Sequence, residues 1–200
     1  MPEVKLFLAV DAIVLWGRLE AAAGRSLPAP FWASAWLGGQ ALARHVLDHR
    51  ETVAGRRVLD VGSGSGLVAI AAAMADASAV VANDIDPYAM AAIRANARVN
   101  SVRVTLSAHD LLDGDGEAAD VVLAGDALYN RSLADRVVPF LIRAADRGAQ
   151  VLVGEPGRGH VSMDVLKVVA RYHVHGMGAP KDSTVRTSSV LTVNRPASHL

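Results

Sequence analysis

The chain has 200 residues, 52% of them hydrophobic, and its 20 Lys and Arg residues balance its 20 Asp and Glu residues. This length and hydrophobic content predict a single domain with a substantial core. The balanced charge provides no overall field for nucleic acid or an anionic membrane, so we expect a protein or small-molecule partner. Because the chain contains no cysteine, disulfides, thiolate chemistry and cysteine-based metal sites are excluded, and we expect no metal centre.

The first predicted element is an amphipathic helix from about Pro2 to Ala23, which we expect to cover one side of the core and to end at Gly24. Its apolar positions at helical spacing are Leu6, Val10, Ile13, Val14 and Leu19. Lys5 and Asp11 interrupt the apolar run, and no cluster of positive charge precedes it. We therefore expect neither a signal peptide nor a membrane span, and a cytoplasmic location.

An aromatic segment follows a loop that contains two prolines. Trp32 and Trp36 stand four residues apart, beside the pair Gly38-Gly39 and ahead of a predicted helix over residues 41–49. Such aromatic residues can pack the core beneath that helix, which is the simpler interpretation from composition. Alternatively, they can line a pocket for an alkylammonium group or an adenine ring.

Residues 58–67, VLDVGSGSGL, predict a buried strand that leads into a glycine-rich turn and a helix from Leu67 to Ala75. The glycines at 62, 64 and 66 remove each Cβ that would keep a ligand away from the backbone. Leu67 stands where a dinucleotide fingerprint needs its third glycine, which disfavours a nicotinamide cofactor. The leading acid, Asp60, instead favours a ligand with a cationic amine and no phosphate, such as S-adenosylmethionine. A tight turn that binds nothing is the alternative.

Acidic residues follow the next predicted strand, residues 79–82. Asp84 lies eighteen positions beyond Gly66, which is the spacing expected of an acid that binds ribose hydroxyls. Asp86 directly precedes Pro87, and this pair is typical of a helix cap followed by the first helical residue. We therefore predict Asp84 as a ligand and Asp86 as the cap of a helix that runs to about residue 99.

The third predicted strand, residues 102–106, leads to Asp110 and Leu111. At the carboxyl edge of a doubly wound sheet, Asp110 can accept a hydrogen bond from an adenine amino group while Leu111 packs on the ring. A surface turn is the alternative for these two residues.

The fourth predicted strand, residues 120–124, breaks at the sequence GDALY, which contains Asp126 and Tyr129. Its tip lies at the place where the reactive end of a ligand is expected in this kind of sheet. We expect both side chains to border the reacting groups. A capping Asp and a packed Tyr are the structural alternative.

The C-terminal part predicts a helix over residues 133–145, a strand over residues 150–153 that ends near Glu155, and a helix over residues 161–171. Residues 172–177 and 188–193 predict an antiparallel hairpin with a polar tip. The whole pattern predicts an α/β fold, namely a doubly wound, seven-stranded and mostly parallel Rossmann-like sheet with an antiparallel edge strand.

The order of these motifs resembles the class I S-adenosylmethionine-dependent methyltransferases, and the residues after the fourth strand resemble the D-x-x-Y motif of their protein-lysine methyltransferases. More narrowly, the chain is similar to the electron transfer flavoprotein beta-subunit lysine methyltransferases. The segments that carry the narrower similarity are Phe31-Trp32-Ala33 with Trp36, Gly38-Gly39-Gln40-Ala41-Leu42, Ala82-Asn83-Asp84-Ile85-Asp86-Pro87, Asn96 with Asn100, Gly125-Asp126 and Gly154-Glu155-Pro156-Gly157-Arg158. Asn130 follows the D-x-x-Y motif, where a second acid is common.

The resemblance implies a single methyltransferase domain over residues 1–200, with residues 1–50 as a helical cover and lid. It implies methylation of a lysine on the electron transfer flavoprotein beta subunit, with S-adenosylmethionine as cofactor and S-adenosylhomocysteine as product. We expect a monomer with no nucleic-acid or membrane partner. The implied cofactor-binding residues are Trp36, Gln40, Asp60, Gly62, Gly64, Gly66, Asp84, Ile85, Asp110 and Leu111. The implied catalytic residues are Asp126, which would attract and orient the lysine ammonium, and Tyr129, and the implied substrate-binding residues are Trp32, Glu155 and Arg158.

Two alternative functions stay open. One is a methyltransferase that acts on a ribosomal protein or a small amine. The other is an interaction module that binds S-adenosylmethionine without catalysis, although the acids at the successive strand tips argue against it.

Overall fold

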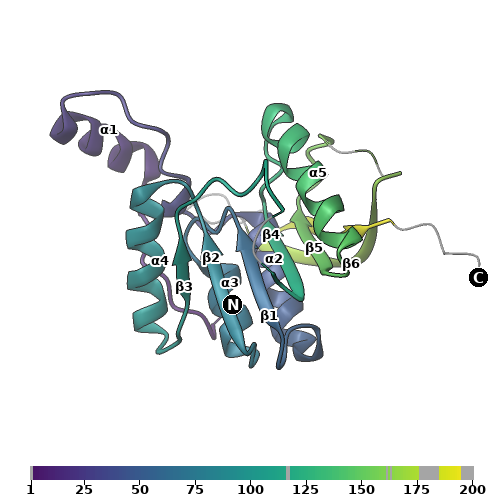
Figure 1. The fold of residues 1–200 in the computed structure, drawn as a ribbon. Coiled ribbons are helices and arrows are strands. Elements are labelled where there is room, and N and C mark those ends of the chain that lie inside the picture. The colour runs from purple at the N-terminus through teal and green to yellow at the C-terminus, as the bar shows by residue number, and fades with distance from the viewer. Residues whose placement is uncertain (1, 116–117, 161, 163, 176–184, 195–200) are drawn as a thin grey trace, which may run out of the picture.

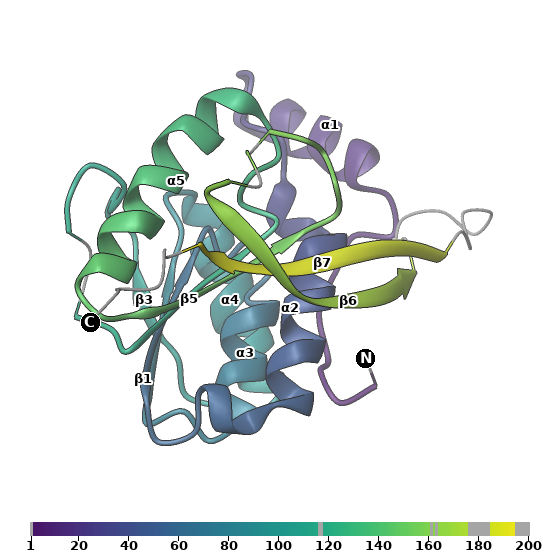
Figure 2. The same cartoon turned by 90° about the vertical axis from the view of Figure 1, so that its right-hand side faces the viewer.

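The computed structural model describes residues 2–115, 118–160, 162, 164–175 and 185–194. The strands are β1 (Arg57–Val61), β2 (Ala79–Asn83), β3 (Thr105–Ser107), β4 (Val121–Gly125), β5 (Gln150–Glu155), β6 (Leu166–His175) and β7 (Val185–Val193). They form one sheet in the order β3-β2-β1-β4-β5-β7-β6 (Figure 1; β7 is labelled in Figure 2). Strands β1 to β5 are parallel, whereas β7 runs antiparallel to both β5 and β6. The predicted fold is confirmed, and the reversed strand lies one position inside the edge.

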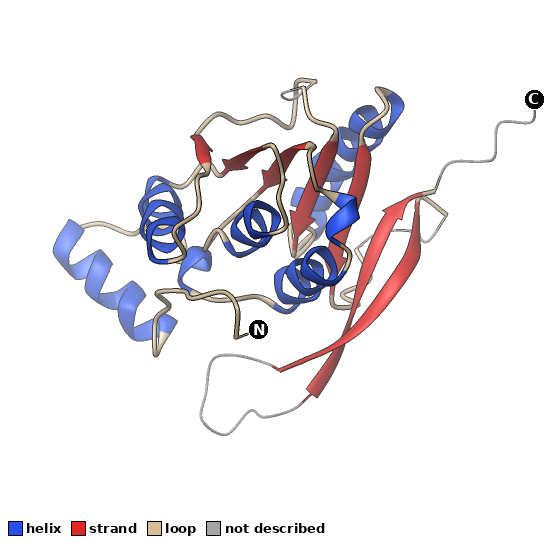
Figure 3. Ribbon diagram, turned by 90° about the horizontal axis from the view of Figure 1, so that it is seen from below, coloured by secondary structure: helices blue, strands red, loops and turns tan. Residues whose placement is uncertain are grey.

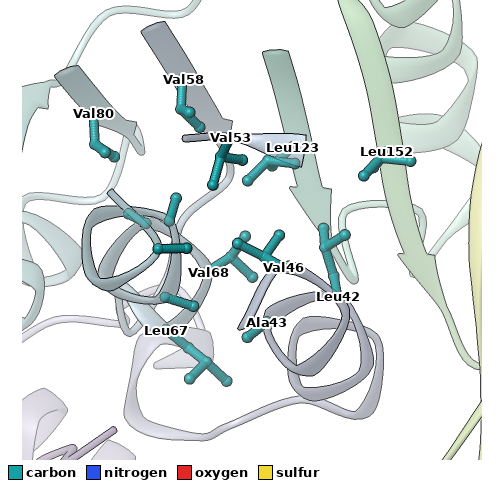
Figure 4. Close-up of a cluster of buried hydrophobic side chains, with 14 of the residues drawn as sticks. Leu42, Ala43, Val46, Val53, Val58, Leu67, Val68, Val80, Leu123 and Leu152 are labelled. Carbon is teal, nitrogen blue, oxygen red and sulfur yellow. The ribbon is translucent and has the colours of Figure 1, made fainter. Parts of the chain in front are cut away.

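Helices cover both faces of the sheet (Figure 3). The helices are α1 (Ala12–Ala23), α2 (Leu37–Asp48), α3 (Leu67–Met74), α4 (Pro87–Val99) and α5 (Arg131–Asp146), with short 3-10 turns η1 (Phe31–Ala33) and η2 (Arg50–Thr52). Helices α2, α3 and α4 contribute to the hydrophobic core on one face, and α5 to the core on the other. In the first core, α2 and α3 pack side by side beneath the strands (Figure 4). The burial of these apolar side chains is the main stabilising term of the fold.

The amino end of α2 meets the ends of β4 and β5 through glycines. A Cβ atom at Gly38 or at Gly154 would collide with the backbone of the other residue, and a Cβ at Gly125 would lie 2.9 Å from the Gly39 Cα atom. Only glycine permits this backbone-to-backbone approach. The contact places the start of α2, and with it Trp36, over the carboxyl edge of the sheet.

The N-terminal prediction is wrong in its first half. Residues 2–10 form no helix, and α1 begins at Ala12, after the Asp11 carboxylate caps it by accepting from the backbone N–H groups of Ile13 and Val14. The segment before α1 instead binds to α4, because the Asn96 Oδ1 atom accepts from the Phe7 N–H at 2.7 Å. The end of α1 at Gly24, which has a φ of 63°, is confirmed.

Helix α1 does not cover the core as expected. None of its residues is buried, and it projects from the body of the molecule (Figure 1). Its inner side instead holds the following loop, since the Trp16 Nε1–H donates to the Leu27 carbonyl at 3.0 Å and the Leu27 N–H donates to Glu20 at 2.9 Å. The helix therefore supports residues 25–29 rather than the sheet.

The helix predicted over residues 161–171 is also wrong. Residues 161 and 163 lie outside the described residues, and β6 begins at Leu166. Exposed positions alternate with buried or half-buried ones from Leu166 to Val174, and a bulge shifts the register between Val168 and Ala170. Valines at helical spacing are equally compatible with a strand, and their β-branched side chains favour one. The predicted hairpin pairing is confirmed for the described strands, while residues 176–177 of the first predicted strand and 178–184 of the tip lie outside the described residues.

Candidate active site

A cavity of about 730 Å³ lies at the carboxyl edge of the sheet. The predicted site residues that line it are Trp32, Trp36, Gly62, Gly64, Asp84, Ile85, Asp110, Leu111, Asp126, Tyr129 and Arg158. The predicted residues that do not line it are Gln40, Asp60, Gly66 and Glu155. The fold thus brings most of the predicted site residues together in this cavity. The other four lie behind its walls.

The glycine turn between β1 and α3 needs its glycines for two reasons. Gly62, Gly64 and Gly66 have φ values of 64°, 56° and 82°, which side-chain-bearing residues rarely adopt. Gly62 and Gly64 line the cavity, whereas Gly66 faces α4, where an added Cβ would lie 3.3 Å from Ile93. The first two glycines therefore open the backbone to a ligand, and the third serves packing.

Asp60 lies beneath this turn and is only 1% exposed. Its Oδ2 atom accepts from the Ser63 hydroxyl at 2.6 Å and from the Ala69 N–H at 3.1 Å. Its Oδ1 atom is buried and has no hydrogen-bond partner among the described residues. Burial raises the pKa of Asp60 to about 7. Asp60 thus joins the turn to the start of α3, and burial of its carboxyl group disfavours the charged form.

Asp84, at the tip of β2, is joined to the same turn. Its Oδ2 atom accepts from the Gly64 N–H at 2.8 Å, and its Oδ1 atom accepts from the Asp86 N–H at 3.0 Å. Burial raises the pKa of the Asp84 carboxyl. Asp86 caps α4 by accepting from the Tyr88 N–H at 2.8 Å, as predicted, although it also lines the cavity. The next side chain, Ile85, is 68% exposed at the cavity rim.

Asp110 and Leu111 form the wall opposite α4. The Asp110 carboxylate accepts from the Leu112 N–H at 3.1 Å and pairs with Arg136 at 3.0 Å, and both contacts lower its pKa. Sequence reasoning missed Arg136, which lies on α5 and lines the cavity. It also missed Asn83, whose Nδ2–H₂ group donates to the His109 carbonyl at 2.8 Å and thereby joins the tips of β2 and β3. A buried amide at a strand tip was the available signal for Asn83.

Two aromatic groups line the cavity. Phe31 contacts Trp36 edge-on, with ring centroids 5.8 Å apart, and lies 5.0 Å from the Tyr129 ring. Trp32 stacks on Tyr88 at 6.2 Å. All five residues line the cavity rather than the core, so the pocket interpretation of the tryptophans is the one that the structure favours. Phe31 and Tyr88 were missed as site residues.

The segment between these aromatic rings and α2 is held by side-chain donors. The Trp36 Nε1–H donates to the Phe31 carbonyl at 2.7 Å, and the Gln40 Nε2–H₂ group donates to the Ala35 carbonyl at 2.7 Å. Gln40 therefore fixes the approach to α2 from behind the cavity wall.

Asp126 is the most constrained acid of the site. It is 5% exposed and has a φ of 65°, which is unusual for a residue with a side chain. Its Oδ2 atom accepts from the Gly38 N–H at 2.7 Å, so it caps α2 from another strand, and its Oδ1 atom pairs with the Arg158 guanidinium. Both carboxylate oxygens therefore have partners.

Glu155 and Tyr129 complete this end of the cavity. The Glu155 carboxylate accepts from the backbone N–H groups of Gly157 and Arg158, the latter at 2.8 Å, and so folds the turn that brings Arg158 to Asp126. Burial, with a smaller contribution from the charge of Asp84, raises the pKa of Tyr129, whose hydroxyl therefore keeps its proton at neutral pH.

A second cavity, of about 680 Å³, lies at the opposite edge of the sheet. Two of its three arginines form ion pairs, Arg57 with Asp120 at 2.8 Å and Arg147 with Asp115 at 3.1 Å, and the third, Arg56, donates to the Gln150 side chain at 2.6 Å. It lacks a glycine turn and is remote from the strand tips where ligands bind in such sheets. The first cavity is therefore the candidate active site.

Comparisons with known proteins agree with this placement. A family model described as ribosomal protein L11 methyltransferase (PrmA) matches residues 41–138, which include the glycine turn, Asp84 and Asp126. An electron transfer flavoprotein beta subunit lysine methyltransferase from Danio rerio is 41% identical over 159 residues, which cover 78% of this chain and 61% of that protein. The protein of the same name from Rattus norvegicus is 35% identical over 195 residues, which cover 94% of this chain and 76% of that protein. The chain belongs to this family.

This family member spans only part of some of its relatives, as the 61% coverage of the Danio rerio protein shows. Among solved structures, the ribosomal protein L11 methylase from Lactobacillus delbrueckii subsp. bulgaricus superposes with a TM-score of 0.55 at 23% identity, and the match covers 77% of this chain and 76% of that one. At this identity the likeness shows the fold alone. In the described part of the chain, no helix has the length and apolar character needed to cross a membrane.

Proposed function

We propose that this protein is an S-adenosylmethionine-dependent protein-lysine methyltransferase that acts on the electron transfer flavoprotein beta subunit. The observation that carries the proposal is that one cavity joins the acid-bearing glycine turn to an aromatic end formed by Phe31, Trp36 and Tyr129. Membership of the family supports the choice of acceptor.

The residues of the glycine-turn end fit the proposed cofactor. Asp84 offers carboxylate oxygens at a strand tip, where they can accept from ribose hydroxyls. Ile85 and Leu111 offer apolar contact for an adenine ring, and Asp110 a hydrogen-bond acceptor. The buried Oδ1 atom of Asp60, which has no hydrogen-bond partner among the described residues, lies below the turn, where a carboxyl group suits a cationic ligand better than a phosphate. When bound, S-adenosylmethionine supplies an electrophilic methyl group on a sulfonium centre.

The aromatic end suits a lysine side chain. The rings of Phe31, Trp36 and Tyr129 are each partly exposed, so they can contact the methylene stem of a lysine and attract its ammonium through their faces. The amine must lose a proton before it can react, which costs about 4 to 5 kcal/mol at neutral pH from a pKa near 10.4. The exclusion of water by the rings lowers the pKa of such an amine, because burial disfavours its charged form.

Asp126 acts in this proposal as a positioning residue. Because its oxygens already hold Arg158 and the amino end of α2, the carboxylate is not free to serve as the base that removes the proton. It holds the guanidinium at the cavity wall and fixes the start of α2, next to Trp36. Most of the rate enhancement then comes from orientation of the amine toward the methyl group.

The test uses the purified protein, isotopically labelled S-adenosylmethionine and purified electron transfer flavoprotein beta subunit, with mass spectrometry to locate the methyl group. The variant Tyr129→Ala removes one wall of the aromatic end and is therefore expected to lose activity. Methyl label on a lysine with the wild type and a loss of at least tenfold with the variant support the proposal. No label on the beta subunit overturns the assigned substrate.

A second candidate acceptor is a ribosomal protein, because the family model that matches residues 41–138 is described by methylation of ribosomal protein L11. An extract from cells that lack the gene distinguishes the two acceptors. Label on a ribosomal protein alone would keep the chemistry and replace the substrate. No labelled protein, despite measured cofactor binding, would favour a small amine or a module without activity.

A further inference from the structure

The β6–β7 hairpin carries unbalanced positive charge in a chain whose overall charge is balanced. Its described strands contain Lys167, Arg171 and Arg186, and no Asp or Glu. No hydrogen bond or ion pair joins any of these cations to another described residue. Arg57 and Arg136, by contrast, pair with aspartates, whereas Arg94 and Arg98 on α4 also have no ion pair among the described residues.

The strand register places this charge next to the candidate active site. Ser189 on β7 pairs with Glu155 on β5 and, on its other side, with Arg171 on β6. Because neighbouring strands lie about 4.8 Å apart, the Arg171 backbone is roughly 10 Å from that of Glu155. Glu155 holds the turn that carries Arg158, a residue of the cavity wall. Arg171 is therefore level with the carboxyl edge where the cavity opens.

The end of the hairpin extends beyond that edge. Val174 pairs with Arg186, three positions past the Arg171–Ser189 pair, so Arg186 lies roughly 10 Å farther along the strands. Figure 2 shows the two long strands crossing the molecule and reaching past the body that α2 and α3 form. Both cations thus stand at or beyond the edge from which a protein substrate must approach. Because side chains alternate along a strand, Arg171 shares one face of the hairpin with Ser189, and Arg186 shares the other face with Val174.

Exposed apolar side chains accompany the cations. Val169 is 46% exposed and Val185 is 53% exposed, and both belong to the hairpin. A mixture of exposed apolar and arginine side chains is typical of protein interfaces. Charge at an open strand edge also protects against aggregation, and both β6 and the part of β7 beyond Ser189, where β5 no longer pairs with it, are such edges.

We propose that the projecting β6–β7 hairpin, through Arg171 on one face and Arg186 on the other, binds acidic side chains of the protein substrate and thereby brings its lysine to the cavity. This inference rests on the proposed function and names the chemistry of the docking partner. Charge complementarity across such a surface accelerates encounter and excludes wrongly oriented partners. The aromatic end of the cavity accepts the lysine side chain, and the hairpin selects the protein that presents it.

The test compares steady-state methylation of purified electron transfer flavoprotein beta subunit by wild-type protein and the charge-reversal variant R171E/R186E. We expect the variant to lower kcat/KM by at least about tenfold through KM, with kcat changed by less than about twofold. We also expect wild-type KM to rise between about 50 and about 300 mM salt, and the variant to lose this dependence. Thermal unfolding of each protein verifies that the variants are folded.

The matched control is R94E/R98E, which makes the same change of charge on exposed positions of α4, on the other side of the molecule (Figure 1). The kcat/KM of R94E/R98E should stay within about twofold of the wild type at about 150 mM salt, because salt screens charges that lie far from the bound substrate. Equal losses in both variants, or no loss in R171E/R186E, would overturn the docking assignment while the methyltransferase function stands. A wild-type protein that leaves the beta subunit unmethylated would overturn the proposed acceptor and the docking assignment with it.

Discussion

Asp126 and Arg158 form an ion pair across the mouth of the candidate active site, although 32 positions separate them in the chain. The pair joins the tip of β4 to the turn after β5, and the second carboxylate oxygen of Asp126 caps α2. Three segments that line the cavity therefore meet at one side chain.

This arrangement predicts strong coupling between Asp126 and Arg158. Arg158→Gln leaves a buried carboxylate without its cation, and we expect it to lower the free energy of unfolding by about 2 kcal/mol. Asp126→Asn should cost a similar amount, and the double variant less than the sum of the two. A double-mutant cycle by urea denaturation measures the coupling, and additive single-variant effects would show that the pair is not formed in solution.

Gly38 should not tolerate a side chain. Gly38→Ala brings a Cβ against the Gly154 carbonyl, so we expect a loss of at least about 3 kcal/mol of stability, or failure to fold. Gly17→Ala is the matched control, because an added Cβ there meets no atom within 4 Å, and α1 should gain about 0.5 to 1 kcal/mol. Thermal unfolding compares the two variants. Similar melting temperatures would mean that α2 docks less closely than described.

Asp60 predicts a specific dependence of stability on pH. Its pKa is about 7 in the folded protein and 3.8 as a free side chain, so the folded state keeps a proton that the unfolded state releases between these values. The unfolded state is thereby favoured as pH rises, and Asp60 should remove up to about 4 kcal/mol of stability between pH values of about 4 and 7.

The variant Asp60→Asn does not titrate, which isolates this contribution. The stability of the wild type minus that of the variant should fall as pH rises through that window, because other groups cancel in the difference. Urea denaturation at pH values of about 5 and about 8 measures it. A difference that stays constant between the two pH values would show that Asp60 is ionised throughout.

Tyr129 should act through its ring more than through its hydroxyl. Tyr129→Phe keeps the contact with Phe31 at 5.0 Å and should retain methylation within about tenfold, whereas Tyr129→Ala opens the aromatic end and should lose about a hundredfold in kcat/KM. Binding of S-adenosylhomocysteine, measured by calorimetry, should be nearly unchanged in both. Equal losses in Phe and Ala variants would instead assign the hydroxyl a role in handling the proton.

The local pattern was sufficient for much of the fold and for the glycine-turn end of the cavity. The glycine turn and the cap formed by Asp86 depend on residues close together in the sequence, where backbone geometry and turn chemistry decide the outcome. The position of Asp84 followed from its spacing after the glycine turn. The tryptophan segment was ambiguous by composition, because an aromatic ring suits a core and a pocket equally well.

Only the tertiary structure decided the remainder. Residues 2–10 do not form the predicted helix, because the Asn96 side chain binds the Phe7 backbone. Residues 166–171 form a strand because their backbone pairs with β7. In the same way, Asp126 meets Arg158 and Gly38 only after β4, β5 and α2 have packed together. The sequence by itself determined which chemical groups stand at each strand tip, since these are local features. Their partners are distant in the chain, and packing alone selects them.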